Sequence, residues 1–210
     1  MNLFESAQFH TSIAKLEDFK PSILPEIAFV GRSNAGKSTS INVLTRHKRL
    51  AFASKMPGRT QLVNFFTLSE KNPDFSLRPV AELVDLPGYG FSQAAPDVRK
   101  TWQRLAGGYL ATRDNLVGVV MVMDARHPFK DTDLWILETL QTRPVRIHFL
   151  LNKADQLKKS EKKPVLDSAK KFAQSIGPFV TAQLFSGLKK EGVSDLEKTL
   201  LAWINRQEIS

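Results

Sequence analysis

The 210-residue chain contains no cysteine. This absence excludes a disulfide framework, a zinc site built on thiolates and a catalytic cysteine. Long apolar runs are also lacking, because no stretch approaches the roughly 20 apolar residues that a membrane-spanning helix needs. The first residues carry neither the apolar core nor the small-residue cleavage site of a secretory signal. We therefore expect a cytoplasmic protein without a membrane partner.

What the chain has in excess is positive charge. Thirty Lys and Arg against 21 Asp and Glu leave a formal net charge of +9. The basic residues concentrate in residues 45–59 and 99–113, which contain no acid, and in residues 156–171, which hold six lysines and two acids. Such stretches favour a polyanionic partner, although a run of charges is more often simply a solvated face.

The order of apolar segments predicts an α/β fold. Apolar runs at residues 27–30, 116–123, 145–151 and 179–185 lack polar alternation, as is typical of strands covered on both faces. Residues 61–68 and 79–84 flank a short polar loop and fit an antiparallel pair at the edge of the sheet.

Helical periodicity is expected at residues 37–45, 96–111, 131–141, 160–175 and 194–206. Ser194 and Glu197 have capping-box spacing at the start of the last helix, and Gly107-Gly108 predicts a break between two short helices in the second. Strands that alternate with helices favour a mostly parallel sheet with helices on its faces. No linker or repeat divides the chain, so we expect an N-terminal extension over residues 1–26 and one domain over residues 27–210.

A phosphate-binding loop is predicted directly after the first of these strands. Its glycines let backbone N–H groups converge on phosphate oxygens at a helix N-terminus, where the helix dipole also favours anions. Lys37 would contact the β- and γ-phosphates, and Ser38 would ligate Mg²⁺. The predicted nucleotide contacts in this loop are Gly31, Arg32, Ser33, Asn34, Ala35, Gly36, Lys37 and Ser38.

A second phosphate-side motif follows the strand at residues 79–84. Asp85 would hold Mg²⁺ through a water molecule, and Gly88 would bring its N–H to the γ-phosphate. The pattern also occurs in ordinary turns, so its weight comes from its position at a strand end. The predicted contacts of this motif are Asp85, Leu86, Pro87 and Gly88.

A third motif, after the strand at residues 145–151, selects the base. Asp155 can accept hydrogen bonds from the N1–H and the exocyclic amine of guanine, whereas adenine would leave this carboxylate unpaired. Asn152 would bind the other edge of the purine and tie this loop to the phosphate loop, and the stem of Lys153 would lie on the ring. The predicted contacts on this side are Asn152, Lys153, Ala154, Asp155, Phe185, Ser186 and Gly187.

Together these motifs resemble those of translation-factor-related GTPases, and most closely those of the bacterial EngB (YihA/YsxC) family. Residues 56–61, 85–90, 124–126 and 188–192 share in the resemblance, which extends over residues 27–204. It implies a three-layer P-loop GTPase fold with a six-stranded, mostly parallel sheet flanked by helices. It further implies GTP hydrolysis to GDP and phosphate, a switch role in assembling the large ribosomal subunit, and a requirement in cell division and septation.

The resemblance also implies a threonine of a first switch between the phosphate loop and Asp85. Thr60 fits best, because Thr39 and Thr45 fall in a predicted helix and Thr67 falls in a predicted strand. Its hydroxyl would join Mg²⁺ and its N–H would hold the γ-phosphate. The contacts expected around it are Gly58, Arg59, Thr60, Gln61 and Leu62, and the predicted catalytic set is Lys37, Thr60 and Gly88.

A catalytic glutamine is absent, since Tyr89 stands where Ras-like GTPases carry the residue that orients the attacking water. We therefore expect slow intrinsic hydrolysis, on the order of 10⁻⁴ s⁻¹, and we assign no general base. As in related GTPases with this asparagine, Asn34 would help to hold a K⁺ ion beside the phosphates.

Other functions are weighed against this one. Tyr89 keeps open a nucleotide-stabilised scaffold that binds RNA or the ribosome with negligible turnover. A P-loop nucleoside kinase is disfavoured by the base-selective loop and the lack of an Arg-rich lid. His148 lies in a predicted buried strand, which indicates a structural histidine. The expected partners are a guanine nucleotide and the RNA and proteins of a large-subunit precursor, with the protein itself a monomer.

Overall fold

The computed structural model describes residues 2–52, 62–89, 100–141 and 143–205. One seven-stranded sheet lies at its centre, with the strand order β1-β3-β4-β2-β5-β6-β7. The strands are β1 (Gln8–Ile13), β2 (Glu26–Gly31), β3 (Val63–Lys71), β4 (Leu77–Asp85), β5 (Leu116–Asp124), β6 (Arg146–Asn152) and β7 (Val180–Leu184). The α-helices are α1 (Lys37–Leu44), α3 (Gly108–Thr112), α4 (Asp131–Gln141), α5 (Lys159–Ile176) and α6 (Val193–Ile204). Short helical turns are η1 (Leu3–Ser6), η2 (Leu16–Asp18), the π-helical η3 (Gln103–Gly107) and η4 (Ala154–Gln156).

Strand direction brings the predicted motifs to one edge of the sheet. Strands β4, β2, β5, β6 and β7 run parallel, and β1 and β3 are antiparallel to their neighbours. The carboxyl ends of the parallel strands therefore share an edge, where ligands of open α/β sheets bind.

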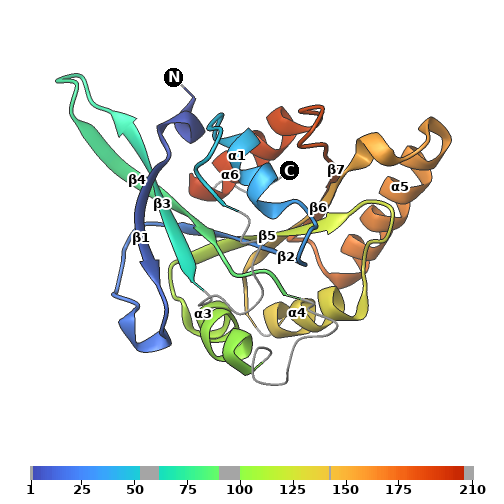
Figure 1. Ribbon diagram of the computed structural model, residues 1–210, viewed down its shortest axis with the longest axis horizontal. Helices are drawn as coiled ribbons and strands as arrows, with labels where there is room; N and C mark the ends of the chain where they lie inside the picture. The colour runs from blue at the N-terminus through green and yellow to red at the C-terminus, as the bar shows by residue number, and fades with distance from the viewer. Residues whose placement is uncertain (1, 53–61, 90–99, 142, 206–210) are drawn as a thin grey trace.

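The sheet separates two cores. In β2, Ile27 and Phe29 join the core that includes side chains of α1 and α6, whereas Ala28 and Val30 join the core that includes side chains of α3, α4 and α5. This alternation follows from the two-residue period of a strand. Figure 1 shows the resulting layers, with α1 and α6 on one side of the sheet and α3 and α4 on the other. The α/β class with a mostly parallel sheet is confirmed.

The predicted number of six strands is wrong. Strand β1, within residues 1–26, pairs antiparallel with β3 and adds a seventh. The β3–β4 pair is antiparallel as expected, but β1 rather than this pair forms the edge of the sheet. The central residues of β1 are His10-Thr11-Ser12, and all six residues of the strand are exposed or half-buried. An edge strand with little buried surface has no apolar periodicity from which the sequence could predict it.

The break predicted at Gly107-Gly108 is also wrong. Both glycines have helical backbone angles, and η3 runs directly into α3. Gly108 serves a close contact instead, because a Cβ atom there would lie 2.7 Å from Leu16 Cδ2 of η2.

The capping box predicted at Ser194 and Glu197 does not form. Gly192, with φ of 77°, occupies the N-cap of α6, and no side chain caps this end. Glu197 instead accepts a hydrogen bond from Asn2 Nδ2 at 2.6 Å and lies 3.6 Å from Arg46. Strand β7 begins at Val180, which leaves the predicted strand residue Phe179 outside it and exposed.

Within the described residues, no helix is long and apolar enough to span a bilayer.

Candidate functional site

The phosphate loop lies between β2 and α1. Asn34 and Gly36 have left-handed φ values of 66° and 95°, and the backbone N–H of Ala35 donates to Arg32 O at 3.0 Å. A side chain at Gly36 would strain the left-handed backbone and displace Asn152, since its Cβ atom would lie 2.1 Å from Asn152 Nδ2. These turns end at the first residue of α1, where unpaired N–H groups and the helix dipole favour an anion.

Lys37 and Asp85 meet at this end of α1. The ammonium group of Lys37 donates to Asp85 Oδ1, and both side chains are nearly buried, at 11% and 5% exposure. Strand β4 ends at Asp85, so the sheet places this carboxylate beside the start of α1. The contact joins the two phosphate-side motifs that the sequence predicts.

The segment after β4 is bound to the phosphate loop by its backbone. Leu86 N donates to Phe29 O at 3.1 Å, and Tyr89 N donates to Gly31 O at 3.2 Å. In return, Ser33 N donates to Tyr89 O at 3.0 Å. Gly88 lies close to the same loop, because a Cβ atom there would be 3.3 Å from Ser33 Oγ. The Asp85–Gly88 motif and the phosphate loop thus form one surface.

The side chain of Tyr89 is buried beneath α4. Its hydroxyl donates to Asp133 Oδ1 at 2.8 Å, and Asp133 Oδ2 lies 3.4 Å from Arg32 Nε of the phosphate loop. Burial raises the pKa of both Tyr89 and Asp133. Trp102 reinforces the segment by donating its indole N–H to Pro87 O at 2.8 Å. Asp133 is a residue that the sequence did not indicate, since an acid in the first turn of a helix is commonplace.

Asn152 connects the phosphate loop with the loop after β7. Its Nδ2 donates to Ala35 O at 2.9 Å, and its Oδ1 accepts from Gly187 N at 3.2 Å. The predicted tie between the phosphate loop and the loop after β6, which begins at Asn152, is therefore present, and the bond to Gly187 adds the loop after β7. It fixes the distance between the phosphate end and the base end of the site.

The remaining base-side residues surround Asp155. Ser186 Oγ donates to its Oδ1 and accepts from Lys189 N at 3.0 Å. Ala154 N donates to Phe185 O at 3.0 Å. Phe185 and Leu86 are both fully buried, and their backbone N–H groups donate to Leu151 O and Phe29 O, so these two residues support the site from within the protein.

Lys153 extends over Asp124 at the end of β5. Its backbone is left-handed, with φ of 62°, and its Nζ donates to Asp124 Oδ2 at 3.1 Å. Hydrogen bonds from Arg126, and then from Lys153, hold the pKa of Asp124 well below its ordinary value. This gives a physical role to residues 124–126, which the sequence indicated only by resemblance.

Part of the predicted site lies outside the described residues, namely Gly58, Arg59, Thr60 and Gln61. Leu62 is described and is 37% exposed. Within the described part of the chain, no three His, Asp or Glu side chains form a metal cluster. His148 is structural as predicted, because its ring nitrogens bond Thr181 Oγ1 at 2.7 Å and Gln183 Oε1 at 3.0 Å.

Known proteins are similar to this chain in sequence and in fold. The family model described as "50S ribosome-binding GTPase" matches residues 26–153. A probable GTP-binding protein EngB of Neisseria meningitidis serogroup B is 47% identical over 98% of this chain and 94% of its own length. Its counterpart in Ralstonia nicotianae is 44% identical over 97% of this chain and 88% of its own length.

Solved structures agree in fold. A crystal structure of a probable GTP-binding protein engB, 18% identical, superposes with a TM-score of 0.58 over 87% of this chain and 99% of its own. An Era variant of Aquifex aeolicus bound to GDP and AlF4⁻, 21% identical, gives 0.65 over 86% of this chain and 56% of its own. From the sequence relatives and the matched family model, the chain is a GTP-binding GTPase that belongs to the EngB family.

Proposed function

We propose that the protein hydrolyses GTP to GDP and phosphate at the carboxyl edge of its sheet and uses this cycle as a switch in assembling the large ribosomal subunit. The observation that carries the proposal is the pair of hydrogen bonds by which the Asn152 side chain joins the phosphate loop to the loop after β7. The family description, "50S ribosome-binding GTPase", supports the ribosomal partner.

The phosphates are proposed to lie over the loop at residues 31–38, against the N-terminus of α1. Lys37 would share its charge between Asp85 and the β- and γ-phosphates, because Asp85 already holds the ammonium group at this position. Gly88 would donate its N–H to the γ-phosphate from the adjoining segment.

The donor set at this end fits Mg²⁺, which prefers hydroxyl, carboxylate and water oxygens. We propose that Ser38 ligates the ion directly and Asp85 through water, and that Thr60, outside the described residues, supplies a further hydroxyl. When bound, the ion supplies positive charge to the phosphate oxygens. Asn34, exposed and left-handed, is proposed to help hold K⁺ beside them, so equal hydrolysis rates in KCl and NaCl would contradict that role.

Guanine is proposed to bind against Asp155. The carboxylate would accept from the N1–H and the exocyclic amine, while Ser186 orients it by donating to Oδ1. Asn152 would face the other edge of the purine and the Lys153 stem would lie on the ring. The Asp124 contact supports this position, because it fixes where the Lys153 ammonium group lies.

Hydrolysis without a partner is proposed to be slow, on the order of 10⁻⁴ s⁻¹. The hydroxyl of Tyr89 is bonded to Asp133, so it is not directed at an attacking water. Lys37, Thr60 and Gly88 remain the proposed catalytic groups, acting by charge and positioning. Faster turnover would require a group from the ribosomal partner.

Co-sedimentation with large ribosomal subunits, in GTP analogue, GDP and no nucleotide, tests the proposal. We expect binding in GTP analogue and weak binding in the other two conditions. Equal binding in all three would contradict a switch. Multiple turnover stimulated by subunits would eliminate the scaffold alternative that Tyr89 keeps open.

The protein is proposed to act as a cytoplasmic monomer, and depletion is expected to impair septation.

A further inference from the structure

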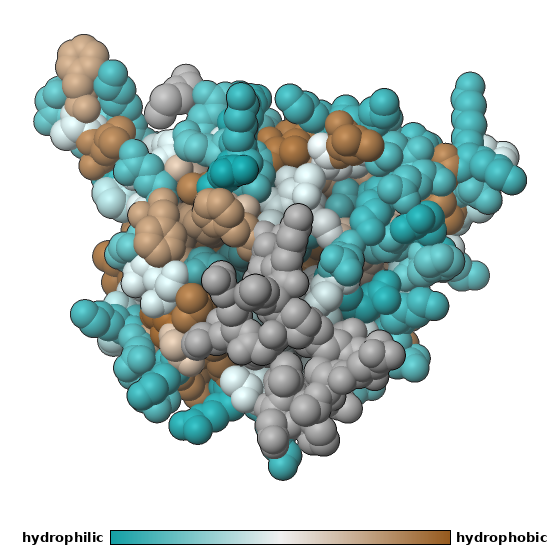
Figure 2. All heavy atoms as spheres, viewed as in Figure 1, coloured by the Kyte–Doolittle hydropathy of each residue, from teal (hydrophilic) through white to brown (hydrophobic). Residues whose placement is uncertain are grey.

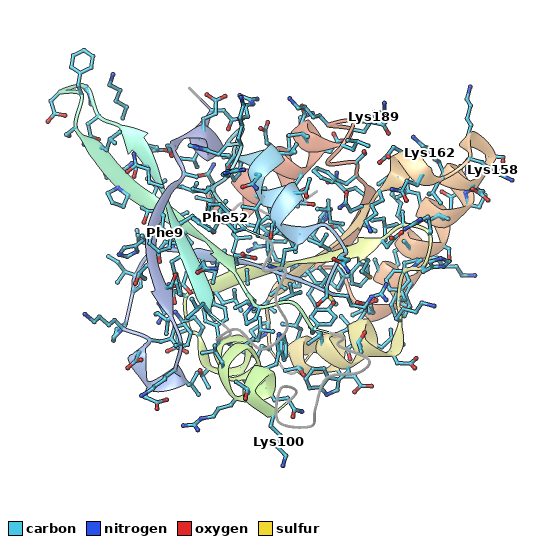
Figure 3. All side chains as sticks on the ribbon, in the orientation of Figure 1. Phe9, Phe52, Lys100, Lys158, Lys162 and Lys189 are labelled. Atoms are coloured by element: carbon cyan, nitrogen blue, oxygen red, sulfur yellow. The ribbon has the colours of Figure 1, made fainter. Side chains whose placement is uncertain are left out.

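An apolar groove lies between β1, β3 and the segment that follows α1. It has a volume of about 410 Å³, and Phe9 and Phe52 lie on its walls. Phe9 is 59% exposed and Phe52 is 70% exposed, whereas Phe66 beneath them is buried. Figure 3 labels Phe9 on β1 and Phe52 beside β3, and Figure 2 shows, in the same view, brown hydrophobic side chains over this part of the surface.

Hydrogen bonds and strand pairing position the backbone that carries the two aromatic residues. Phe9 is opposite Phe66 in the β1–β3 pair, with ring centroids 6.2 Å apart in an edge arrangement. The segment that leads to Phe52 is fixed by Asn42 of α1, whose Oδ1 accepts from Leu50 N at 3.0 Å and from Ala51 N at 2.7 Å. Asn42 Nδ2 also donates to Ala51 O at 2.8 Å. The backbone that presents the two rings is therefore already ordered, which lowers the entropy cost of binding.

The charge beside the groove is positive. Arg49 lines it, Lys48 is exposed next to it, and none of the lining residues is acidic. Neither cation forms an ion pair with another residue among those that the structure describes. The other lining polar groups are the Ser12 hydroxyl and the Asn64 amide, which are bonded to each other at 2.6 Å. A purely apolar protein segment would leave the Arg49 guanidinium group without a partner.

We propose that this groove binds an unpaired RNA base, stacked on Phe9 and Phe52, with Arg49 contacting the adjoining phosphate. Aromatic side chains beside a basic groove are the usual platform for single-stranded nucleic acid, because every base has a face that stacks. Bases of a duplex are stacked on each other and do not reach such a groove. This inference rests on the proposed ribosomal function and names the part of the partner that this face contacts.

The experiment measures binding of a single-stranded oligouridine of about twelve nucleotides by fluorescence anisotropy, over a range of salt. We expect Phe9→Ala and Phe52→Ala each to weaken binding by about tenfold or more without changing the salt dependence. Arg49→Ala should weaken binding and reduce the salt slope by about one, since one phosphate contact is lost. Phe179→Ala is the matched control, because Phe179 is 60% exposed and does not line the groove.

Duplex RNA of the same length serves as the second probe, and co-sedimentation with large subunits as the third. Unchanged oligouridine binding in both groove variants, or equal losses in Phe179→Ala, would overturn the inference. If the groove variants lose subunit binding but keep oligouridine binding, the groove takes a ribosomal protein segment and the inference is again overturned. Failure of the wild-type protein to co-sediment in any nucleotide state would instead contradict the proposed function. Retained nucleotide binding and unchanged thermal unfolding confirm that each variant is folded.

Discussion

At the scale of single residues, Asp155 gives the sharpest prediction. Asp155→Asn exchanges one acceptor oxygen for a donor, so the amine of guanine would face another N–H group. Xanthine has a carbonyl oxygen at that position and would accept from the new amide. We expect the variant to lose about a hundredfold in GDP affinity and to gain affinity for xanthosine diphosphate, measured by nucleotide fluorescence titration.

Asp167→Asn is the control, since Asp167 is an exposed acid that pairs with Lys163 on the surface of α5. It should bind GDP as the wild type does. An Asp155→Asn variant with wild-type GDP affinity and no gain for xanthosine diphosphate would remove Asp155 from the base site.

His148 predicts how stability depends on pH. Burial lowers its pKa to about 4, against about 6.5 in an unfolded chain. Between these values the unfolded state binds one more proton, so the free energy of unfolding falls as the pH falls, by about 1.4 kcal/mol per pH unit at most. Urea unfolding at pH 7 and pH 5 should show this loss in the wild type and a smaller one in His148→Gln. Parallel losses in both proteins would refute the assignment.

The sequence predicts a functional residue when its chemistry requires a motif of fixed residue types and spacing. Lys37, Asp85 and Asn152 belong to motifs whose spacing is set by phosphate or base geometry, and the structure brings Lys37 to Asp85 and Asn152 to the phosphate loop. Asp133 and Asn42 bind other parts of the protein and belong to no sequence motif, so only the fold reveals their partners.

At the scale of elements, the segment after β4 is held by the Tyr89–Asp133 hydrogen bond. Tyr89→Phe removes the donor and leaves a buried carboxylate with one partner fewer. We expect a loss of about 1–3 kcal/mol in the free energy of unfolding. Turnover of GTP should stay close to the wild-type rate, because the hydroxyl does not face the phosphates.

Tyr109→Phe provides a matched control far from the phosphate loop. Tyr109 is also fully buried and donates to a carboxylate, Glu26 Oε2, at 2.7 Å. Both variants should lose similar stability in urea unfolding and retain turnover. A large drop in turnover confined to Tyr89→Phe would mean that this hydroxyl takes part in hydrolysis.

Elements with one strongly buried face were predictable, and those without one were not. Strand β2 has all six residues buried, and its apolar run is evident in the sequence. Strand β1 has none of its six residues buried, so the sheet gains a strand that no pattern indicates. The start of α6 was predicted to within one residue, but its capping box was wrong, because Gly192 turns the chain at the cap and Glu197 bonds to Asn2 from the N-terminal segment.

At the scale of the whole molecule, the basic stretches supply less free charge than their sequence suggests. Arg113 of the stretch at residues 99–113 is only 12% exposed and binds the buried carboxylate of Glu26 at 2.6 Å. Arg46 pairs with Glu5, and Lys162 pairs with Glu191 at 2.9 Å. Ion pairs between residues far apart in the chain cannot be read from local charge, so only part of the predicted basic surface is free for RNA.

Arg113 is accordingly predicted to stabilise the fold. Arg113→Ala leaves Glu26 buried with Tyr109 as its one remaining side-chain partner in the described part of the chain, and should cost about 3–5 kcal/mol of unfolding free energy. Arg104→Ala is the control, since Arg104 is 77% exposed and should change stability by less than about 1 kcal/mol. Urea denaturation distinguishes the two. An Arg113→Ala protein of wild-type stability would contradict the structural role.

The central claim is that the nucleotide held by Asp155 controls docking on the large ribosomal subunit. The most direct measurement is co-sedimentation of Asp155→Asn with large subunits in a non-hydrolysable xanthosine triphosphate analogue and in the GTP analogue. The account predicts that the variant binds subunits with the xanthosine analogue and not with the GTP analogue, the reverse of the wild type. Equal co-sedimentation of the variant with either nucleotide, or with none, would contradict it.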